Sequence, residues 1–327
     1  MRLLVLASGR GSNFEAIVKA VKTGYLRSQV VGLLCDKECP AIEISKRNSI
    51  PVSVLGPKDY VDKHDYIKEL LEVIKKYQPD YIILAGYMRI LPVELLDEYP
   101  MRVINIHPSL LPEYPGKDSI TRAWEDRAAL TGVTVHYVND KMDAGPIIAQ
   151  ETINISDGMR SSGGLEKLEE EIHKIEHRIY PGSIKKLTED PFDLLVVSRC
   201  LTGVNCRYDG GNKLSKRVET FIKNFKGKVV DVCPEVEAGF SVPRPTADII
   251  NGKAMMKDVG DITEELENAC KNIILRFSNY KNILAILKEK SPSCGVRRPM
   301  GVFKSCMEKS LKIKKDQRFF IVSEEDL

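Results

Sequence analysis

Short apolar runs alternate with amphipathic stretches along most of this chain, a pattern typical of α/β domains built on a mostly parallel sheet. We therefore predict the α/β fold class, with helices flanking an open sheet. In the first part of the chain the predicted strands are Arg2–Ala7, Gln29–Cys35, Tyr81–Ala85, Arg102–Ile106, Gly132–Val138 and Pro146–Glu151. The predicted helices there are Asn13–Lys22, Ala41–Arg47, Tyr60–Tyr77, Ser119–Glu125 and Leu165 to about Lys186.

The chain has 327 residues, which is enough for two domains at roughly 100–200 residues each. A new strand begins near Leu194, after Thr188-Glu189-Asp190-Pro191, so the predicted domains are residues 1–189 and 190–327. The second is a smaller α/β domain with predicted strands near Leu194–Val197, Lys228–Val232 and Ile283–Leu287, and helices near Leu214–Asn224 and Ile262–Asn279. The glycine- and serine-rich residues 156–164 predict a flexible connection before the last helix of the first domain.

Composition and charge exclude several classes of protein. The chain is 43% hydrophobic and 29% charged, with no apolar run near the roughly 18 residues of a membrane span, so we predict a cytoplasmic protein without a membrane partner. Residues 1–187 hold 25 basic and 26 acidic side chains, and residues 188–327 hold 24 and 20. Residues 296–320 alone carry eight basic and two acidic side chains, and the basic ones include Arg297, Arg298, Lys312, Lys314 and Lys315. A surplus of basic side chains that is confined to one short segment differs from the broad basic face of a nucleic-acid-binding protein. We therefore predict no nucleic-acid partner.

A glycine-rich loop follows the first predicted strand and leads directly into a helix. Its sequence is Gly9-Arg10-Gly11-Ser12-Asn13, and backbone N–H groups at such a helix start can hold an anion. Phe14 stands where the third glycine of a dinucleotide fingerprint would be, so that fingerprint is excluded. Two interpretations stay open from the loop alone: a phosphate site, or a tight turn in which Ser12 or Asn13 caps the helix.

An amide, an imidazole and a carboxylate occur near predicted strand ends. Asn105 and His107 are two residues apart and project to one face of a strand, at the end where open α/β sheets bind ligands. Asp143 lies in a loop that also contains a glycine. This combination suits acyl transfer, in which the amide and the imidazolium stabilise a developing oxyanion and the carboxylate raises the basicity of the imidazole. A purely structural role for His107 is the alternative.

These segments together resemble the phosphoribosylglycinamide formyltransferase family. The resemblance rests on Gly11-Ser12-Asn13, Ala85-Gly86-Tyr87-Met88-Arg89-Ile90-Leu91, Asn105-Ile106-His107-Pro108-Ser109-Leu110-Leu111-Pro112, Thr131-Gly132-Val133-Thr134-Val135-His136 and Met142-Asp143-Ala144-Gly145-Pro146, in this order from residue 1 to about 187. It implies transfer of a formyl group from the co-substrate 10-formyltetrahydrofolate to the amine of glycinamide ribonucleotide, in purine biosynthesis. A formyltetrahydrofolate hydrolase is the alternative within the wider group.

The resemblance also implies roles for single residues. Asn105, His107 and Asp143 would form the catalytic triad. The ribonucleotide phosphate would bind at Gly11, Ser12 and Asn13, and its glycinamide end at Glu176. The folate pocket would be lined by Met88, Arg89, Leu91 and Asp140, the last of these in the loop 139–143.

The cysteines point to a second kind of chemistry. All five histidines lie at or before residue 177, whereas six of the eight cysteines follow residue 199. Cys200, Cys233 and Cys294 each come after a predicted strand, and their spacing is that of neither a zinc ribbon nor a ferredoxin. Thiolates brought together from distant loops favour an iron–sulfur cluster. The alternative is that they are buried small hydrophobes, which is the interpretation we prefer for Cys270 and Cys306.

The motifs around these cysteines resemble a domain family whose characterised members are thiouracil desulfidases. They are Ser198-Arg199-Cys200-Leu201-Thr202-Gly203-Val204-Asn205-Cys206-Arg207-Tyr208-Asp209-Gly210, Val232-Cys233-Pro234-Glu235 and Lys288-Glu289-Lys290-Ser291-Pro292-Ser293-Cys294-Gly295. The resemblance implies a 4Fe-4S cluster on Cys200, Cys233 and Cys294, catalytic roles for Glu235 and Ser291, and a thiolated nucleobase as substrate. It ends at the basic residues 296–320. A non-catalytic metal-binding or interaction module is the competing interpretation.

Overall fold

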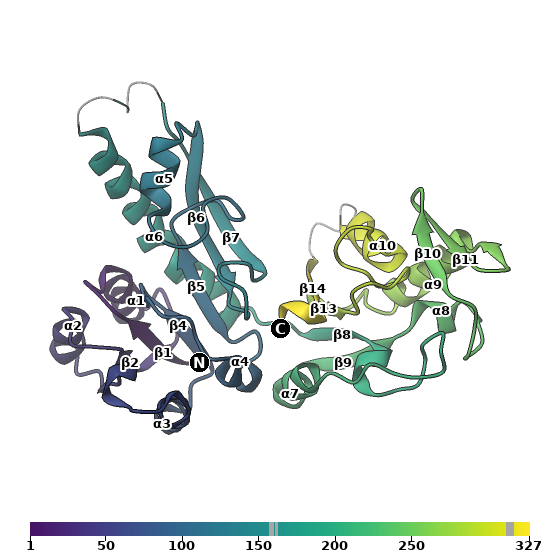
Figure 1. Cartoon of the computed structure of the whole chain (residues 1–327), viewed down its shortest axis with the longest axis horizontal. Helices are drawn as coiled ribbons and strands as arrows, with labels where there is room; N and C mark the ends of the chain where they lie inside the picture. Colours follow the sequence, from purple (N-terminus) through teal and green to yellow (C-terminus); the bar gives the residue numbers. More distant parts are fainter. Residues whose placement is uncertain (157–159, 161–162, 312–316) are drawn as a thin grey trace. The chain divides into compact units, whose positions relative to one another are not determined.

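The computed structural model describes residues 1–156, 160, 163–311 and 317–327. The chain divides into two compact units, Met1–Asp190 and Pro191–Leu327, and each is described by itself (Figure 1). Part of the predicted flexible connection at 156–164 lies outside the described residues, and so do the basic residues Lys312, Lys314 and Lys315. No helix within the described ranges combines the length and the apolar character that a membrane span requires.

The first unit is built on one seven-stranded sheet with the order β3-β2-β1-β4-β5-β6-β7. The strands from β3 to β5 pair in parallel, whereas β6 and β7 join the edge in antiparallel orientation. Their bounds are β1 Arg2–Ala7, β2 Gln29–Cys35, β3 Val52–Val54, β4 Tyr81–Leu84, β5 Val103–His107, β6 Leu130–Tyr137 and β7 Ile147–Asn154. The parallel strands therefore end at a common edge, where loops can carry a ligand site.

Helices cover both faces of this sheet. Their bounds are α1 Ser12–Lys22, α2 Ala41–Arg47, α3 Lys63–Tyr77, α4 Val93–Glu98, α5 Ser119–Glu125 and α6 Gly164–Glu189, with a short 3₁₀ turn η1 at Pro57–Asp59. Side chains alternate along β1, so Leu4 and Leu6 pack with Leu70 of α3 and Leu95 of α4 in one hydrophobic core. Helix α1 packs against α6, which also contacts β6 and β7.

Helix α6 continues past a proline and is tied to the middle of the sheet. Pro181 lies inside the helix, and the fully buried Tyr180 hydroxyl lies within hydrogen-bond distance of the carbonyl oxygens of Leu84 (2.9 Å) and Ile104 (3.0 Å). Those carbonyls belong to β4 and β5. This anchor holds the helix beside the carboxyl ends of the two strands that lead into the site.

The second unit has a parallel four-stranded sheet with the order β14-β13-β8-β9, and a small antiparallel sheet with the order β10-β11-β12. The bounds of the parallel strands are β8 Leu194–Ser198, β9 Lys228–Val232, β13 Asn282–Leu287 and β14 Arg318–Ser323. The small sheet consists of β10 Ala247–Ile250, β11 Lys253–Met256 and β12 Gly260–Asp261. The helices are η3 Arg199–Thr202, α7 Lys216–Asn224, α8 Pro234–Glu237, α9 Thr263–Leu275, α10 Val302–Leu311 and η4 Glu324–Asp326.

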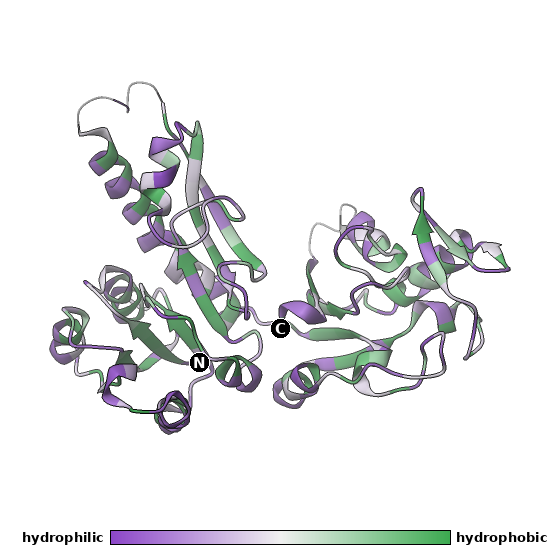
Figure 2. Cartoon of the chain, in the orientation of Figure 1, coloured by the Kyte–Doolittle hydropathy of each residue, from purple (hydrophilic) through white to green (hydrophobic). Residues whose placement is uncertain are grey.

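The α/β prediction is correct for both units, and the interior strands are the most apolar segments of each (Figure 2). The predicted strand and helix ends differ by up to three residues in the first unit. The prediction omitted β3, α4, α8, the whole antiparallel sheet β10–β12, α10 and β14. Apart from α10, which has ten residues, these elements have two to six residues, and the shortest of them are too short to display a hydrophobic period of 2 or 3.6.

Candidate active sites

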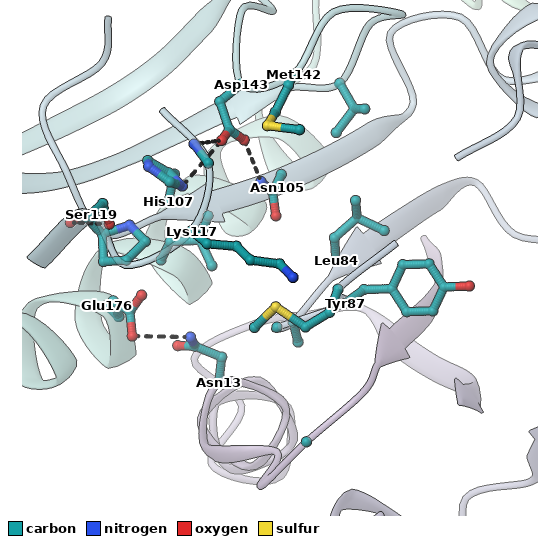
Figure 3. A pocket seen from close by; sticks show the side chains of 18 of the residues that line it. Asn13, Leu84, Tyr87, Asn105, His107, Lys117, Ser119, Met142, Asp143 and Glu176 are labelled. Carbon is teal, nitrogen blue, oxygen red and sulfur yellow. Dashed lines mark hydrogen bonds and ion pairs between the residues drawn. The ribbon is translucent and has the colours of Figure 1, made fainter. Parts of the chain in front are cut away.

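The first unit contains a cavity of about 670 Å³ at the carboxyl ends of its parallel strands. All eleven predicted site residues of this unit line it: Gly11, Ser12, Asn13, Met88, Arg89, Leu91, Asn105, His107, Asp140, Asp143 and Glu176. They come from segments that are far apart in the sequence, from α1 to α6, and the fold brings them to one cavity (Figure 3). A cavity of this size is typical of a site for small molecules.

His107 ends β5 and both of its ring nitrogens have partners. Nε2 lies 2.9 Å from the carbonyl oxygen of Tyr114, which can only accept, so Nε2 carries the proton of the neutral ring. Nδ1 lies 3.5 Å from Oδ2 of Asp143 (Figure 3). Nδ1 is thus the nitrogen that can take up a proton, and Asp143 is the carboxylate that would stabilise the resulting imidazolium.

Hydrogen bonds to two other residues of the protein orient the side-chain amide of Asn105. Its Nδ2 donates to Nε2 of His136 (3.2 Å) and to Oδ1 of Asp143 (3.4 Å). His136 is 1% exposed, burial lowers its pKa, and its Nδ1 donates to the Tyr137 carbonyl (2.8 Å), so a neutral Nε2 accepts from the amide. Figure 3 shows the amide oxygen of Asn105 facing the cavity. Both N–H groups of the amide thus have partners within the protein, and the prediction that the amide stabilises an oxyanion stays a prediction.

The glycine-rich loop has the geometry of an anion site more than of a side-chain cap. Gly11 is the N-cap of α1 with φ +82°, so neither Ser12 nor Asn13 caps the helix. A Cβ on Gly11 would lie 2.8 Å from Cβ of Ala41, which excludes a side chain there. The first N–H groups of α1 are left at the cavity, where the helix dipole adds partial positive charge.

Asn13 and Glu176 pair across the floor of the cavity. Nδ2 of Asn13 donates to Oε2 of Glu176 at 3.2 Å, and both residues are buried. Burial raises the pKa of Glu176 to about 7, while the hydrogen bond from Asn13 acts in the opposite direction. Oδ1 of Asn13 is a buried acceptor without a partner among the described residues, and a ligand donor can satisfy it.

The predicted folate-pocket residues line the other side of the same cavity. Met88 is 70% exposed and its backbone N–H donates to Oγ of Ser8 (3.0 Å), whereas Leu91 is buried. Nε of Arg89 forms a 2.6 Å ion pair with Asp36, which fixes the guanidinium at the cavity edge. Asp140 is exposed on the loop that also holds Asp143.

Sequence analysis did not single out His136 and Lys117, two further residues that line the cavity. Alternation along its strand places His136 on the same face as Thr134. Its position opposite Asn105 comes from the antiparallel pairing of β6 with β5, which the sequence pattern alone does not give. Lys117 lies in the loop between β5 and α5, and nothing in the local sequence indicates that its side chain enters the cavity.

In the second unit the three predicted metal ligands follow three neighbouring strands. Cys200 lies in η3 after β8, Cys233 precedes α8 after β9, and Cys294 follows β13. All three are at most 9% exposed. Cys206 hydrogen bonds to the thiols of Cys200 and Cys233, and the bond to Cys200 is the main reason that its pKa rises to about 11. Burial raises the pKa of Cys294 to about 12.

The predicted pair Glu235 and Ser291 is connected through a third residue. Oγ of Ser293 donates to Oε1 of Glu235 (2.7 Å) and lies 3.1 Å from Oγ of Ser291. The other carboxylate oxygen accepts from Nε of Arg244 at 2.6 Å, and the Arg244 side chain is 3% exposed. Sequence analysis singled out neither Ser293 nor Arg244. Cys270 and Cys306 lie in the hydrophobic core of this unit.

The predicted metal ligands of the second unit are all cysteine thiols. Across the described ranges, no three His, Cys, Asp or Glu side chains are grouped to hold a single metal ion. In an iron–sulfur cluster each thiolate binds a different iron, so the thiols surround the cluster and do not converge on one point. Buried cysteines on three adjacent strand ends, in a unit whose sequence contains no histidine, are consistent with that arrangement.

The fold and the first site define an α/β enzyme domain that binds small molecules at the carboxyl ends of its strands. The chain belongs to the formyl transferase family, whose family model matches residues 1–184. Phosphoribosylglycinamide formyltransferase of Bacillus subtilis (strain 168) is 42% identical over 187 residues, which are 57% of this chain and 94% of that protein.

Solved structures agree with this membership. Glycinamide ribonucleotide transformylase 1 from Geobacillus kaustophilus is 46% identical with a TM-score of 0.54, covering 57% of this chain and 97% of that one. A formyltetrahydrofolate deformylase from Pseudomonas syringae pv. tomato is 28% identical with a TM-score of 0.52, covering 58% and 61%. In the second unit, residues 195–318 match the family model described as 2-thiouracil desulfurase.

Proposed function

We propose that the first unit transfers the formyl group of 10-formyltetrahydrofolate to the amine of glycinamide ribonucleotide, a step of purine biosynthesis. The observation that carries this proposal is one cavity lined by the Asn105–His107–Asp143 cluster, the anion loop and the Asn13–Glu176 pair. The relatives named as formyltransferases for this substrate support it, since the chain covers nearly their whole length.

The two ligands would bind on opposite sides of the catalytic cluster. The ribonucleotide phosphate would accept hydrogen bonds from the N–H groups at Gly11, Ser12 and Asn13. The glycinamide end would lie near Glu176, with the unpartnered Oδ1 of Asn13 accepting from it. The folate would occupy the side lined by Met88, Arg89, Leu91 and Asp140, which brings its formyl group to the triad.

The reaction would then be a direct acyl transfer. The substrate amine attacks the formyl carbon, and the carbonyl electron pair moves onto the formyl oxygen. Nδ1 of His107 takes the proton that the amine loses, and Asp143 stabilises the imidazolium at 3.5 Å. Collapse of the tetrahedral intermediate breaks the bond from carbon to N10 of the folate, which receives that proton from His107. The products are the formylated amine and tetrahydrofolate.

Product analysis separates this proposal from the hydrolase alternative. The purified chain is incubated with 10-formyltetrahydrofolate, with and without glycinamide ribonucleotide, and formate and the formylated ribonucleotide are quantified. Transfer predicts the formylated ribonucleotide, with tetrahydrofolate formed in equal amount only when the acceptor is present. Formate release at the same rate without the acceptor would instead identify a hydrolase.

For the second unit we propose a desulfidase that depends on a 4Fe-4S cluster held by Cys200, Cys233 and Cys294. The proposal rests on three buried thiols at neighbouring strand ends and on the match to the desulfurase family model. A bound cluster would supply an iron with an open position for the sulfur of a thiolated nucleobase. Ser291 and Glu235, bridged by Ser293, would hold water and protons beside that base while oxygen replaces sulfur and sulfide leaves.

Iron and acid-labile sulfide are the first quantities to measure, on protein purified without oxygen. Stoichiometric iron and sulfide, together with sulfide release from thiouracil, would support the desulfidase. Protein that binds no iron after anaerobic reconstitution would favour the alternative, an interaction module. Glycinamide ribonucleotide formylation in the same preparation reports independently on the first unit.

A further inference from the structure

Two cysteine thiols of the first unit lie close together at the end of β2. Sγ of Cys39 is 3.5 Å from Sγ of Cys35, within hydrogen-bond distance for sulfur. Cys35 is the last residue of β2 and is fully buried, whereas Cys39, in the loop before α2, is partly exposed. The formyl transfer proposed above uses neither thiol. Two thiols this close can be joined by a disulfide after a small movement of the chain.

The segment 35–39 supports the cavity at two points. Oδ2 of Asp36 accepts from Nε of Arg89 at 2.6 Å, and Arg89 lines the cavity. Two residues after the segment, the N–H of Ala41 donates to the carbonyl oxygen of Gly9 in the anion loop at 3.2 Å. A movement of this segment therefore reaches both the side of the cavity proposed for the folate and the side proposed for the phosphate.

The two thiols differ in their access to an oxidant. The thiolate is the reactive form of cysteine, and exposure decides which thiol meets a solute first. Burial raises the pKa of the Cys35 thiol, and the neighbouring Cys39 thiol adds to the increase. Cys39 is therefore the thiol that reacts first, and Cys35 is the resolving thiol beside it. An accessible thiol next to a resolving thiol is the arrangement of redox-sensitive cysteine pairs.

We propose that Cys35 and Cys39 are a redox modification site, where a peroxide forms a disulfide that slows formyl transfer. The sulfur of Cys39 attacks one oxygen of hydrogen peroxide, the O–O bond breaks, and a sulfenic acid and water form. The sulfur of Cys35 then attacks the sulfenic sulfur, and the second oxygen leaves as water. The two thiols lose two electrons and two protons in total, and a dithiol reductant reverses the change. The effect on formyl transfer rests on the proposed function, whereas the disulfide does not.

The disulfide is expected to displace the loop 36–40. The sulfurs must approach by about 1.5 Å, because an S–S bond is about 2 Å long. Cys35 is held in place, since β2 pairs with β1 and β3 and the Cys35 carbonyl accepts from the N–H of Leu55 at 2.8 Å. The loop that carries Asp36 therefore moves. A misplacement of about 1 Å in an active site can cost about 100-fold in rate, and part of this movement stays in the loop, so we expect kcat/KM to fall about 10-fold.

Peptide mapping of the full chain after treatment with hydrogen peroxide identifies the disulfide. Trypsin cleaves after Lys37, between the two cysteines, so the disulfide joins the peptides 28–37 and 38–46 into one species that reduction separates. Formylation of glycinamide ribonucleotide is measured on the same samples before treatment, after treatment and after reduction with dithiothreitol. The expected result is the linked species together with a fall in kcat/KM of about 10-fold, both reversed by dithiothreitol.

Two variants show whether this pair causes the loss. Cys39→Ser cannot form the disulfide, so it is expected to have the untreated wild-type kcat/KM and to keep it in peroxide. Cys270→Ala is the matched control, because it removes a thiol of the second unit and should lose activity as the wild type does. Equal inactivation of Cys39→Ser would overturn the proposal, since another oxidised residue would then be the cause.

The disulfide and its effect are tested separately. Peptides that stay unlinked in wild-type protein after treatment with excess peroxide would overturn the modification site. Linked peptides at an unchanged kcat/KM would overturn its effect on formyl transfer. If the wild-type chain formylates no ribonucleotide even when fully reduced, the proposed function fails, while the linked peptides still decide whether the disulfide forms.

Discussion

Asn13 at the start of α1 donates a 3.2 Å hydrogen bond to Glu176 in the middle of α6, although 163 residues separate them in the chain. The contact joins the anion loop to the far wall of the cavity. It also places a carboxyl group with limited access to water beside the expected position of the substrate amine. Burial raises the pKa of this carboxyl to about 7, so its charge changes close to neutral pH.

Glu176 is expected to make the stability of the first unit depend on pH. Its folded pKa lies above the unfolded value, so the folded state binds the proton more tightly. The stabilising contribution is therefore complete below about pH 4.5 and is lost as pH rises through about 7, by at most about 3 kcal/mol. Urea unfolding at pH 5 and pH 8, followed by fluorescence of Trp124, the only tryptophan of the chain, measures this unit.

Glu176→Gln is the comparison that isolates this group. The variant cannot ionise, so the difference in unfolding free energy between pH 5 and pH 8 should shrink relative to wild type. An identical pH dependence in both proteins would assign the effect to other groups.

Asp143→Asn tests the assignment of the proton to Nδ1 of His107. The amide has nearly the shape of the carboxylate but does not stabilise an imidazolium, so kcat is expected to fall about 100- to 10,000-fold. The thermal midpoint should change by only a few degrees. Steady-state kinetics and a melting curve check both parts, and near wild-type turnover would remove Asp143 from the catalytic cluster.

Cys294→Ser is expected to abolish bound iron and sulfide release in the second unit. Cys270→Ala is the matched variant, because Cys270 is buried in the same hydrophobic core as Cys294 but lies within the helix α9 and not in a loop after a strand. It should keep its iron, while formyl transfer should be unaffected in both variants. Iron analysis of the two proteins after the same reconstitution decides the matter: equal iron contents would contradict the ligand role of Cys294.

Arg244→Met is expected to destabilise the second unit. Arg244 and Glu235 form a buried ion pair, and removing one partner leaves an uncompensated charge, at a cost of about 3–5 kcal/mol. Amide hydrogen exchange of the strand β8 measures the loss without relying on a tryptophan. The double variant Arg244→Met/Glu235→Gln should regain part of the stability, and a double variant no more stable than the single one would argue against charge burial as the cause.

The sequence alone determined the α/β class of both units and most of the long elements. This was possible because apolar alternation and helical periodicity are local properties, readable over a strand such as β1 or a helix such as α3. Eleven residues of the first cavity could also be named in advance, since their motifs lie at predicted strand ends or resemble those of a known family. Whether they perform formyl transfer remains a prediction.

Only the tertiary structure decided how those side chains use their hydrogen-bonding groups. His136 turns the Asn105 amide inward, Ser293 stands between Glu235 and Ser291, and Lys117 reaches into the cavity from the loop before α5. Each relationship joins residues from separate elements. The direction of a donor depends on which partner the fold brings within about 3 Å, and no local pattern of residues records that distance.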